Sequence, residues 1–186
     1  LLVPAGTPPG EYMLTLRVYR SQDVAVLPAA FEGGSGGEVT LGTVRVARPQ
    51  LAPPPEALTF EQPLAVDFGD RLRLLGDDSE TDTALLPGEA VEVALYWQAL
   101  ATPGEDFLPR LQLLGAGEKV LAELTEKPVA GTYPTAWWQA GELVRDPHDL
   151  PIPATVPPGH YRLALSLVRA ADGQPVEVTP FEGCCP

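Results

Sequence analysis

Basic residues are scarce in this chain of 186 residues, which has 12 Lys and Arg against 25 Asp and Glu. The formal net charge is −13, and lysine occurs only at Lys119 and Lys127. Proteins that bind nucleic acid need a basic surface that displaces counterions from phosphates. The composition therefore argues against nucleic acid as a partner, and the acidic surface is expected to serve solubility.

Long apolar runs are also missing, since no stretch reaches the roughly 18 residues that a membrane-spanning helix needs. The sequence shows neither an initiator methionine nor a secretory signal peptide. We interpret the chain as an internal fragment of a longer protein, with its targeting information upstream.

Cysteine is limited to the adjacent pair Cys184 and Cys185. Neither histidine is close enough in sequence to complete a zinc site with them. A disulfide between neighbours would form a strained ring, so we expect free thiols or pairing with groups outside this fragment. The pair does not identify the redox compartment.

Helical periodicity is absent as well, because 22 prolines and 18 glycines are spread over the whole length. What the chain has instead is alternating apolar and polar residues in short runs between turn residues. The clearest run is 90–100, where Val91, Val93, Leu95 and Trp97 share one face. This pattern predicts an all-β fold, namely an antiparallel immunoglobulin-like β-sandwich. Further strands are expected at 11–19, 24–27, 39–46, 64–68, 71–75, 109–114, 120–125, 142–145, 160–168 and 176–178.

One segment of the chain occurs twice. Leu1 to Tyr12 returns as Leu150 to Tyr161, both copies ending in a Pro-Pro-Gly-x-Tyr motif that precedes an alternating run. Tyr12 and Tyr161 are 149 residues apart, and the apolar residues that follow them keep that spacing. Self-similarity at a fixed spacing is typical of repeat arrays.

The duplication sets the expected domain organisation. Residues 1–48 are interpreted as the C-terminal strands of a preceding β-sandwich repeat, 49–57 as a proline-rich, semi-rigid linker, and 58–186 as a β-sandwich module. The second copy ends before any counterpart of 39–46. The final strand of the module is therefore either missing or supplied by 39–46, within the chain or in a strand-exchange dimer.

Several short motifs resemble a known module family. They are Pro87-Gly88-Glu89 ahead of the strand 95–99, Tyr133-Pro134-Thr135 with Trp138, and the Pro-Pro-Gly-His-Tyr motif that ends at Tyr161. The chain resembles the repeated β-sandwich modules found beside membrane glycosyltransferase-like segments in bacterial envelope proteins of unknown role. The resemblance implies an extracytoplasmic location in the cell envelope, with neighbouring domains of a larger membrane-associated protein as partners. In that family an apolar strand usually follows Leu-Leu-Gly, whereas an acidic segment stands here.

That acidic segment is the first candidate site. Asp77, Asp78, Glu80 and Asp82 lie within six residues, and carboxylates are ligands that calcium prefers. The segment lacks the glycine placement and the distal glutamate of an EF-hand loop. Calcium is the one cofactor that the sequence suggests, and a solvated acidic loop is the alternative.

Aromatic residues form the second candidate site. Trp137 and Trp138 are adjacent, so on an extended backbone they point to opposite faces and at most one belongs to the core. The other, with Tyr133, would offer a flat platform on which a sugar ring stacks. Packing of these rings in the core or beneath a loop is the alternative, and Trp97 is assigned to the core.

Catalytic motifs are sparse in the sequence. Its two histidines are His148, beside Asp149, and His160, whose counterpart in the first copy is Glu11. No Gly-x-Ser-x-Gly motif is present. We therefore expect a protein that is not an enzyme, an accessory or spacer module that makes protein or surface contacts. The alternative function is a carbohydrate-binding module with an exposed aromatic platform and glycan as its ligand.

Overall fold

The computed structural model describes residues 3, 6–23, 25–31, 34–49, 54, 58, 60–79, 84–86 and 88–180. The chain divides into two compact units, one formed by Pro8–Gln50 and the other by Leu1–Thr7 with Leu51–Pro186. The division at residues 50 and 51 falls inside the predicted linker. The first seven residues group with the larger unit, in which Arg145 N donates a hydrogen bond to Gly6 O at 2.8 Å.

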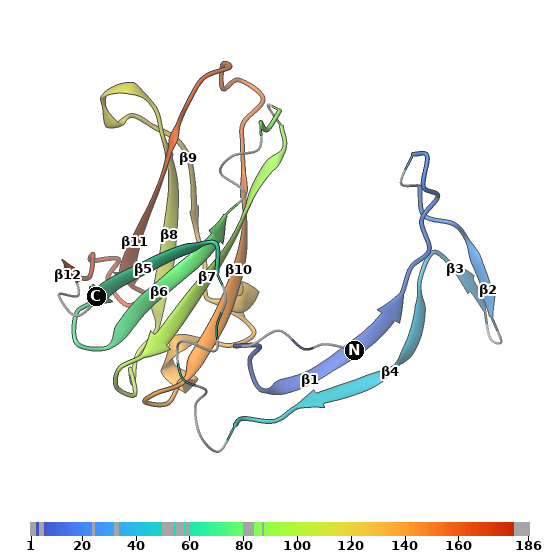
Figure 1. Cartoon of the computed structure of the whole chain (residues 1–186), viewed down its shortest axis with the longest axis horizontal. Coiled ribbons are helices and arrows are strands. Elements are labelled where there is room, and N and C mark those ends of the chain that lie inside the picture. The colour runs from blue at the N-terminus through green and yellow to red at the C-terminus, as the bar shows by residue number, and fades with distance from the viewer. Residues whose placement is uncertain are drawn as a thin grey trace. The chain divides into compact units, whose positions relative to one another are not determined.

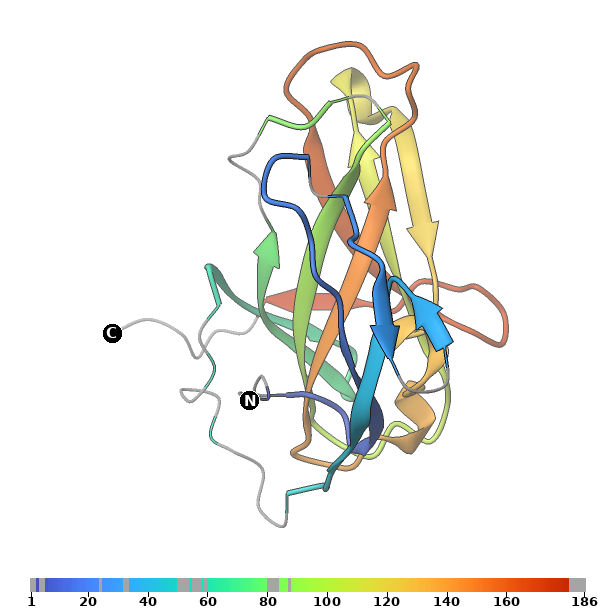
Figure 2. The same ribbon diagram turned by 90° about the vertical axis from the view of Figure 1, so that its right-hand side faces the viewer.

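The larger unit contains two antiparallel sheets that lie one behind the other in Figure 1. The five-stranded sheet has the order β10-β7-β6-β5-β12, and the three-stranded sheet has the order β11-β8-β9. In Figure 2, β10 and β7 run side by side along the module. The strands are β5 (Gln62–Phe68), β6 (Leu72–Ser79), β7 (Ala90–Ala99), β8 (Phe107–Leu114), β9 (Val120–Thr125), β10 (Leu143–Pro151), β11 (Arg162–Arg169) and β12 (Val178–Pro180).

A hydrophobic core lies between these two sheets. Trp97 on β7 is completely buried, as its shared face with Val91, Val93 and Leu95 predicts. Leu111 of β8 and Leu167 of β11 meet it from the three-stranded sheet. The prediction of an all-β, antiparallel fold is confirmed, and the arrangement is β-sandwich-like.

The outer face of β7 is covered too. Ala94 and Tyr96 alternate with the core residues, yet both are buried in a second cluster with Leu58 and Phe60. The Phe60 and Tyr96 rings lie 5.5 Å apart. Gly76 allows this approach, since a Cβ there would lie 2.4 Å from Phe60 Cδ2. Leu58 and Phe60 therefore cover part of the outer face of the sheet.

Strand β10 is longer than the sequence predicts. The expected strand was 142–145, but pairing with β7 continues from Leu143 to Pro151. Proline cannot donate to a central ladder, so Pro147 is typical of a strand end or of an edge strand. Because β10 is the edge strand of its sheet, Pro147 and Pro151 are accommodated. The additional residues bring two ionisable side chains, Asp146 and His148, to the inside of the module.

The smaller unit consists of two ribbons. β1 (Gly10–Leu16) pairs with β4 (Val39–Val46), and β2 (Ala29–Phe31) pairs with β3 (Gly34–Gly36). Large apolar side chains of this unit are exposed, among them Met13, Leu16 and Leu41. Two-stranded ribbons of this kind are at best marginally stable in water on their own. The assignment of residues 1–48 to a larger sandwich repeat stays a prediction.

The duplication seen in the sequence extends to the structure. The isolated bridge between Tyr19 and Val26 recurs between Val168 and Pro175, again 149 residues later. The i,i+3 ion pair of Arg20 with Asp23 recurs in Arg169 with Asp172, and the Tyr12 and Tyr161 hydroxyls each donate to the carbonyl four residues earlier. Strand β2 likewise has its counterpart in β12. The same local chemistry therefore builds the same strand and turn in both places.

Candidate functional site

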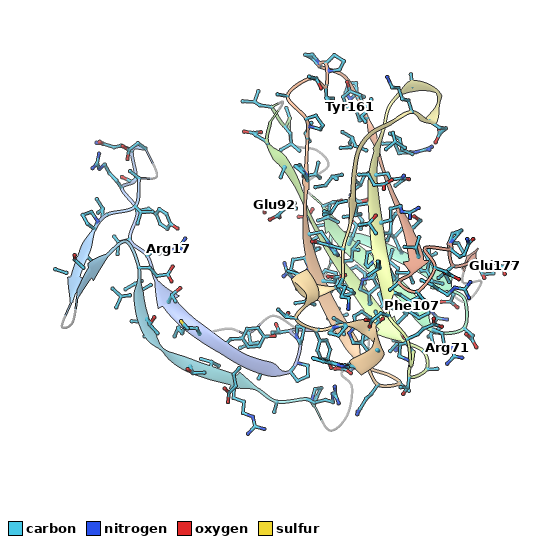
Figure 3. The ribbon with its side chains drawn as sticks, turned by 180° about the vertical axis from the view of Figure 1, so that it is seen from behind. Arg17, Arg71, Glu92, Phe107, Tyr161 and Glu177 are labelled. Carbon is cyan, nitrogen blue, oxygen red and sulfur yellow. The ribbon has the colours of Figure 1, made fainter. Side chains whose placement is uncertain are left out.

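Trp137 is the last residue of a short 3-10 turn, η4 (Thr135–Trp137), and Trp138 caps it; η4 follows another such turn, η3 (Val129–Gly131). The turn is anchored by the buried Thr135, whose hydroxyl donates to Glu105 O at 2.9 Å and accepts from Phe107 N at 2.7 Å. Figure 3 shows Phe107 and Tyr161 at opposite ends of the module. The turn is therefore fixed at the Phe107 end by hydrogen bonds rather than by apolar packing alone.

Only one of the three predicted platform rings is exposed. Trp137 is 62% exposed, whereas Trp138 is 1% and Tyr133 is 4% exposed. Trp138 stacks against Tyr133 with ring centroids 6.4 Å apart, and Trp137 meets the same tyrosine ring edge-on. Trp138 therefore belongs to the core and Trp137 to the surface. A sugar platform at this site would consist of the Trp137 indole, with Tyr133 and Trp138 as its support.

The support beneath Trp137 is polar as well as aromatic. The Tyr133 hydroxyl donates to Glu142 Oε1 at 2.6 Å, and Gln139 N donates to Glu142 Oε2 at 2.9 Å. The Trp138 indole N–H donates to Tyr133 O at 3.1 Å. A buried carboxylate costs free energy unless it is hydrogen-bonded, and here both Glu142 oxygens accept. These bonds hold the backbone around Trp137 in one conformation.

The acidic segment differs from the expected loop. β6 continues through Ser79, so Asp77 and Asp78 are strand residues whose side chains alternate between the two faces. Asp78 accepts from the Tyr96 hydroxyl and from Glu61 N, both at 2.7 Å, and Asp77 accepts from Ser79 Oγ. Glu80 and Asp82 lie outside the described residues. Within the described part of the chain, no group of three or more His, Cys, Asp or Glu side chains has the arrangement of a metal site.

An open groove of about 460 Å³ lies on the outer face of the five-stranded sheet. Arg145 Nε donates to the Tyr96 hydroxyl at 3.3 Å, which connects the guanidinium to Asp78 through the phenol. Burial raises the pKa of Tyr96, and the hydrogen bond to Asp78 raises it further, so the phenol stays protonated. Glu92, labelled in Figure 3, is another wall residue. The lining residues are Phe60, Glu61, Asp78, Glu92, Val93, Ala94, Arg145, Pro147, His148 and Asp149.

Sequence reasoning missed a buried ionic cluster between β9 and β10. Asp146 is completely buried, and its Oδ1 accepts from Val129 N at 2.7 Å while Oδ2 accepts from Trp97 Nε1 at 3.2 Å. His148 Nε2 lies 2.8 Å from Asp146 Oδ2, off the line of an ideal hydrogen bond, and Nδ1 lies 2.8 Å from Glu126 Oε1. One imidazole thus bridges two carboxylates.

The charge state of His148 follows from these neighbours. Burial by itself lowers the pKa of the imidazole, but hydrogen bonding and charge attraction from Asp146, and then from Glu126, outweigh it. The pKa of His148 is therefore raised above its usual 6.5. The His148 side chain is 1% exposed, so a proton on its imidazole lies inside the module. Its contact with Glu126, which directly follows β9, links β10 to the three-stranded sheet.

One signal in the sequence would have revealed this cluster. Val144, Asp146, His148 and Leu150 alternate over residues 144–150, and the structure buries all four on one face. The alternation becomes visible only when Pro147 is read as an edge-strand proline. His160, by contrast, is exposed, as the exchange with Glu11 between the two copies indicates.

No family model, curated protein or solved structure matches this chain. Among the described residues, the structure contains no helix of the length and apolarity needed to cross a membrane. Cys184 and Cys185 lie outside the described residues.

Proposed function

We propose that this chain is part of an array of immunoglobulin-like β-sandwich repeats that acts as a non-catalytic spacer in the cell envelope. Its role would be to hold neighbouring domains of a larger membrane-associated protein apart and to make protein or surface contacts. The observation that carries the proposal is the duplicated strand and turn, repeated with the same hydrogen bonds 149 residues later. Repeats that stack or follow one another in this way are typical of structural arrays.

The order of the strands supports the immunoglobulin-like part of the proposal. The consecutive strands β7 and β8 lie in different sheets, and so do the consecutive strands β10 and β11. β10 pairs with β7 and β11 pairs with β8, so the two pairs interlock across the core. Greek-key sandwiches connect their sheets in this manner.

The proline-rich segment supports the spacer part. Pro49, Pro53, Pro54 and Pro55 occur within seven residues, and such sequences favour extended, semi-rigid backbone. The resemblance to envelope β-sandwich modules supports the extracytoplasmic location. The burial of Asp146 and of the His148 side chain supports a non-catalytic role, because both are engaged with protein groups inside the module.

A double electron–electron resonance experiment tests the spacer. Spin labels are placed at Leu41→Cys in the smaller unit and Val120→Cys in the larger unit, both at exposed positions, with Cys184 and Cys185 changed to Ser. A stiff spacer gives a narrow distance distribution that broadens when the four linker prolines become Gly and Ser. A distribution equally broad before and after that change would refute the spacer.

The exposed Trp137 favours a second candidate, carbohydrate binding. A single indole on a braced turn stacks on the C–H face of a sugar ring, with weak affinity and tolerance for different sugars. Affinity electrophoresis in polysaccharide-containing gels tests it. Carbohydrate binding predicts retardation that is lost in Trp137→Ala and kept in Trp137→Phe; equal mobility of the native chain with and without polysaccharide would rule it out.

A further inference from the structure

The outer edge of β11 is an unusual feature of the larger unit. β11 pairs with β8 on one side. Among the described residues its other side has no named strand beside it and is bonded near its end, where Leu167 O accepts from Val176 N and Arg169 N donates to Gln174 O. The burial of its core-facing residues increases along the strand: Leu163 and Leu165 are half-buried, whereas Leu167 is 1% exposed. The core is therefore less well covered at the beginning of β11 than at its end.

The smaller unit shows what a strand of this type pairs with. β1 is the counterpart of β11, with the same following turn, and β4 runs antiparallel to β1 from Gly10 opposite Val46 to Leu16 opposite Val39. Adding the repeat offset of 149 to the numbers of β1 gives positions 159 to 165 of the larger unit. These are the first residues of β11 and the residues just before it, where the core-facing side chains are half-buried.

We propose that the outer edge of β11 accepts the β4 strand, Val39–Val46, of a second copy of this chain. In the β1 register, Val44 would lie beside Tyr161, Gly42 beside Leu163 and Val39 beside Leu165. The backbone of the incoming strand would satisfy edge N–H and C=O groups, and its valines would cover the exposed part of the core. Strand addition to an open sheet edge is an established mode of recognition.

Charge pairing sets how strong this association is. In the smaller unit Glu11 stands opposite Arg45, a favourable cross-strand pair of opposite charge. The residue of the larger unit that corresponds to Glu11 is His160, which offers no negative charge to Arg45. β4 is therefore expected to prefer β1 of its own chain and to exchange only at high concentration. His160→Glu should restore the pair and tighten the association about two- to fivefold.

Disulfide trapping tests the register. One chain carries Arg162→Cys, another carries Thr43→Cys, and both have Cys184 and Cys185 changed to Ser. The proposal places these two positions directly opposite each other, where Cα atoms about 4.5 to 5.5 Å apart suit a disulfide. A control pair uses Arg162→Cys with Arg45→Cys, two residues out of register and beyond disulfide reach. All three positions are exposed, so each variant should fold, as circular dichroism will check.

The expected result is that mild oxidation of the matched pair gives at least tenfold more mixed dimer than the control pair. Sedimentation velocity should show a dimer whose population rises with concentration and rises further in His160→Glu. Equal yields from the matched and control pairs would overturn the proposed register. A chain that stays monomeric at millimolar concentration would overturn the second copy as occupant, even if a synthetic peptide of residues 38–47 bound to β11.

Discussion

Replacing Asp146 with asparagine tests the buried cluster most directly, because it removes one charge while keeping the size of the side chain. Asp146 is completely buried and faces His148, Trp97 and Val129. Removing one member of a buried ion pair typically costs about 3 to 5 kcal/mol. We expect a loss of this size in the free energy of unfolding at about pH 5, where His148 is protonated in the native protein.

The dependence of this loss on pH follows from the sign of the pKa shift. Because the folded pKa of His148 is raised, its contribution is fully present below the unfolded value of 6.5 and is lost as pH rises through the folded value. Asp146→Asn removes the largest of the causes that raise the pKa of His148, while burial, which lowers it, stays. The pKa of His148 should therefore be lower in the variant, and the variant should lose most stability in acid. The difference between the two proteins should therefore shrink toward about 1 to 2 kcal/mol as pH rises through the folded pKa of His148, because only the stronger bonds of a charged acceptor are then lost.

Urea unfolding followed by tryptophan fluorescence between about pH 5 and pH 9 measures this difference, and Trp97 provides a reporter in contact with Asp146. The matched control is Asp149→Asn, which removes an exposed carboxylate from the same strand and should change stability by less than about 0.5 kcal/mol. A difference that is independent of pH, or that grows as pH rises, would refute the assignment of a buried protonated imidazole.

Three further predictions concern other parts of the larger unit. Tyr133→Phe leaves the buried Glu142 without one donor and should lower stability by about 1 to 3 kcal/mol in urea unfolding, whereas Trp137→Ala should change it by less than about 0.5 kcal/mol. Gly76→Ala should lower the free energy of unfolding by about 1 to 3 kcal/mol, since the new Cβ would collide with the Phe60 ring. Thermal unfolding measures this loss, and an unchanged Tm would contradict the packing of that ring. Calcium should leave Tm unchanged relative to chelator, because the described carboxylates of the acidic segment point to opposite faces and already accept protein donors; a calcium-dependent rise would indicate a metal site.

Strand β7 could be read from the sequence because its alternation is unbroken. Val91 to Trp97 gives four apolar residues at period two, and no proline or glycine interrupts them, so local pattern and tertiary environment agree. The pattern did not predict that the outer face of β7 is buried as well, which only the structure shows. Coverage of Ala94 and Tyr96 depends on Leu58 and Phe60, which reach the sheet from outside it.

The candidate sites were less predictable, because each depends on where a backbone segment ends. The sequence of the acidic segment predicts a loop, but pairing with β7 extends β6 to Ser79. Asp77 and Asp78 therefore point to opposite faces of the sheet. The tryptophan pair lies at the end of a 3-10 turn rather than on an extended strand, although one indole is buried in either case. Asp146 and His148 were hidden by Pro147, whose effect depends on whether its strand lies at the edge of a sheet.

The two copies of the repeat show which structural features follow from the local sequence and which depend on neighbouring strands. The Arg-x-x-Asp turn after β1 and after β11 forms the same backbone bonds in both units, although the two strands have different neighbours. β1 pairs with β4 and β11 pairs with β8, so the choice of partner does not come from the strand itself. The docking proposed for β11 predicts that β4 and β8 occupy opposite edges of this type of strand. Such a strand would then be central in a complete sheet, with a β8-type neighbour on one side and a β4-type neighbour on the other.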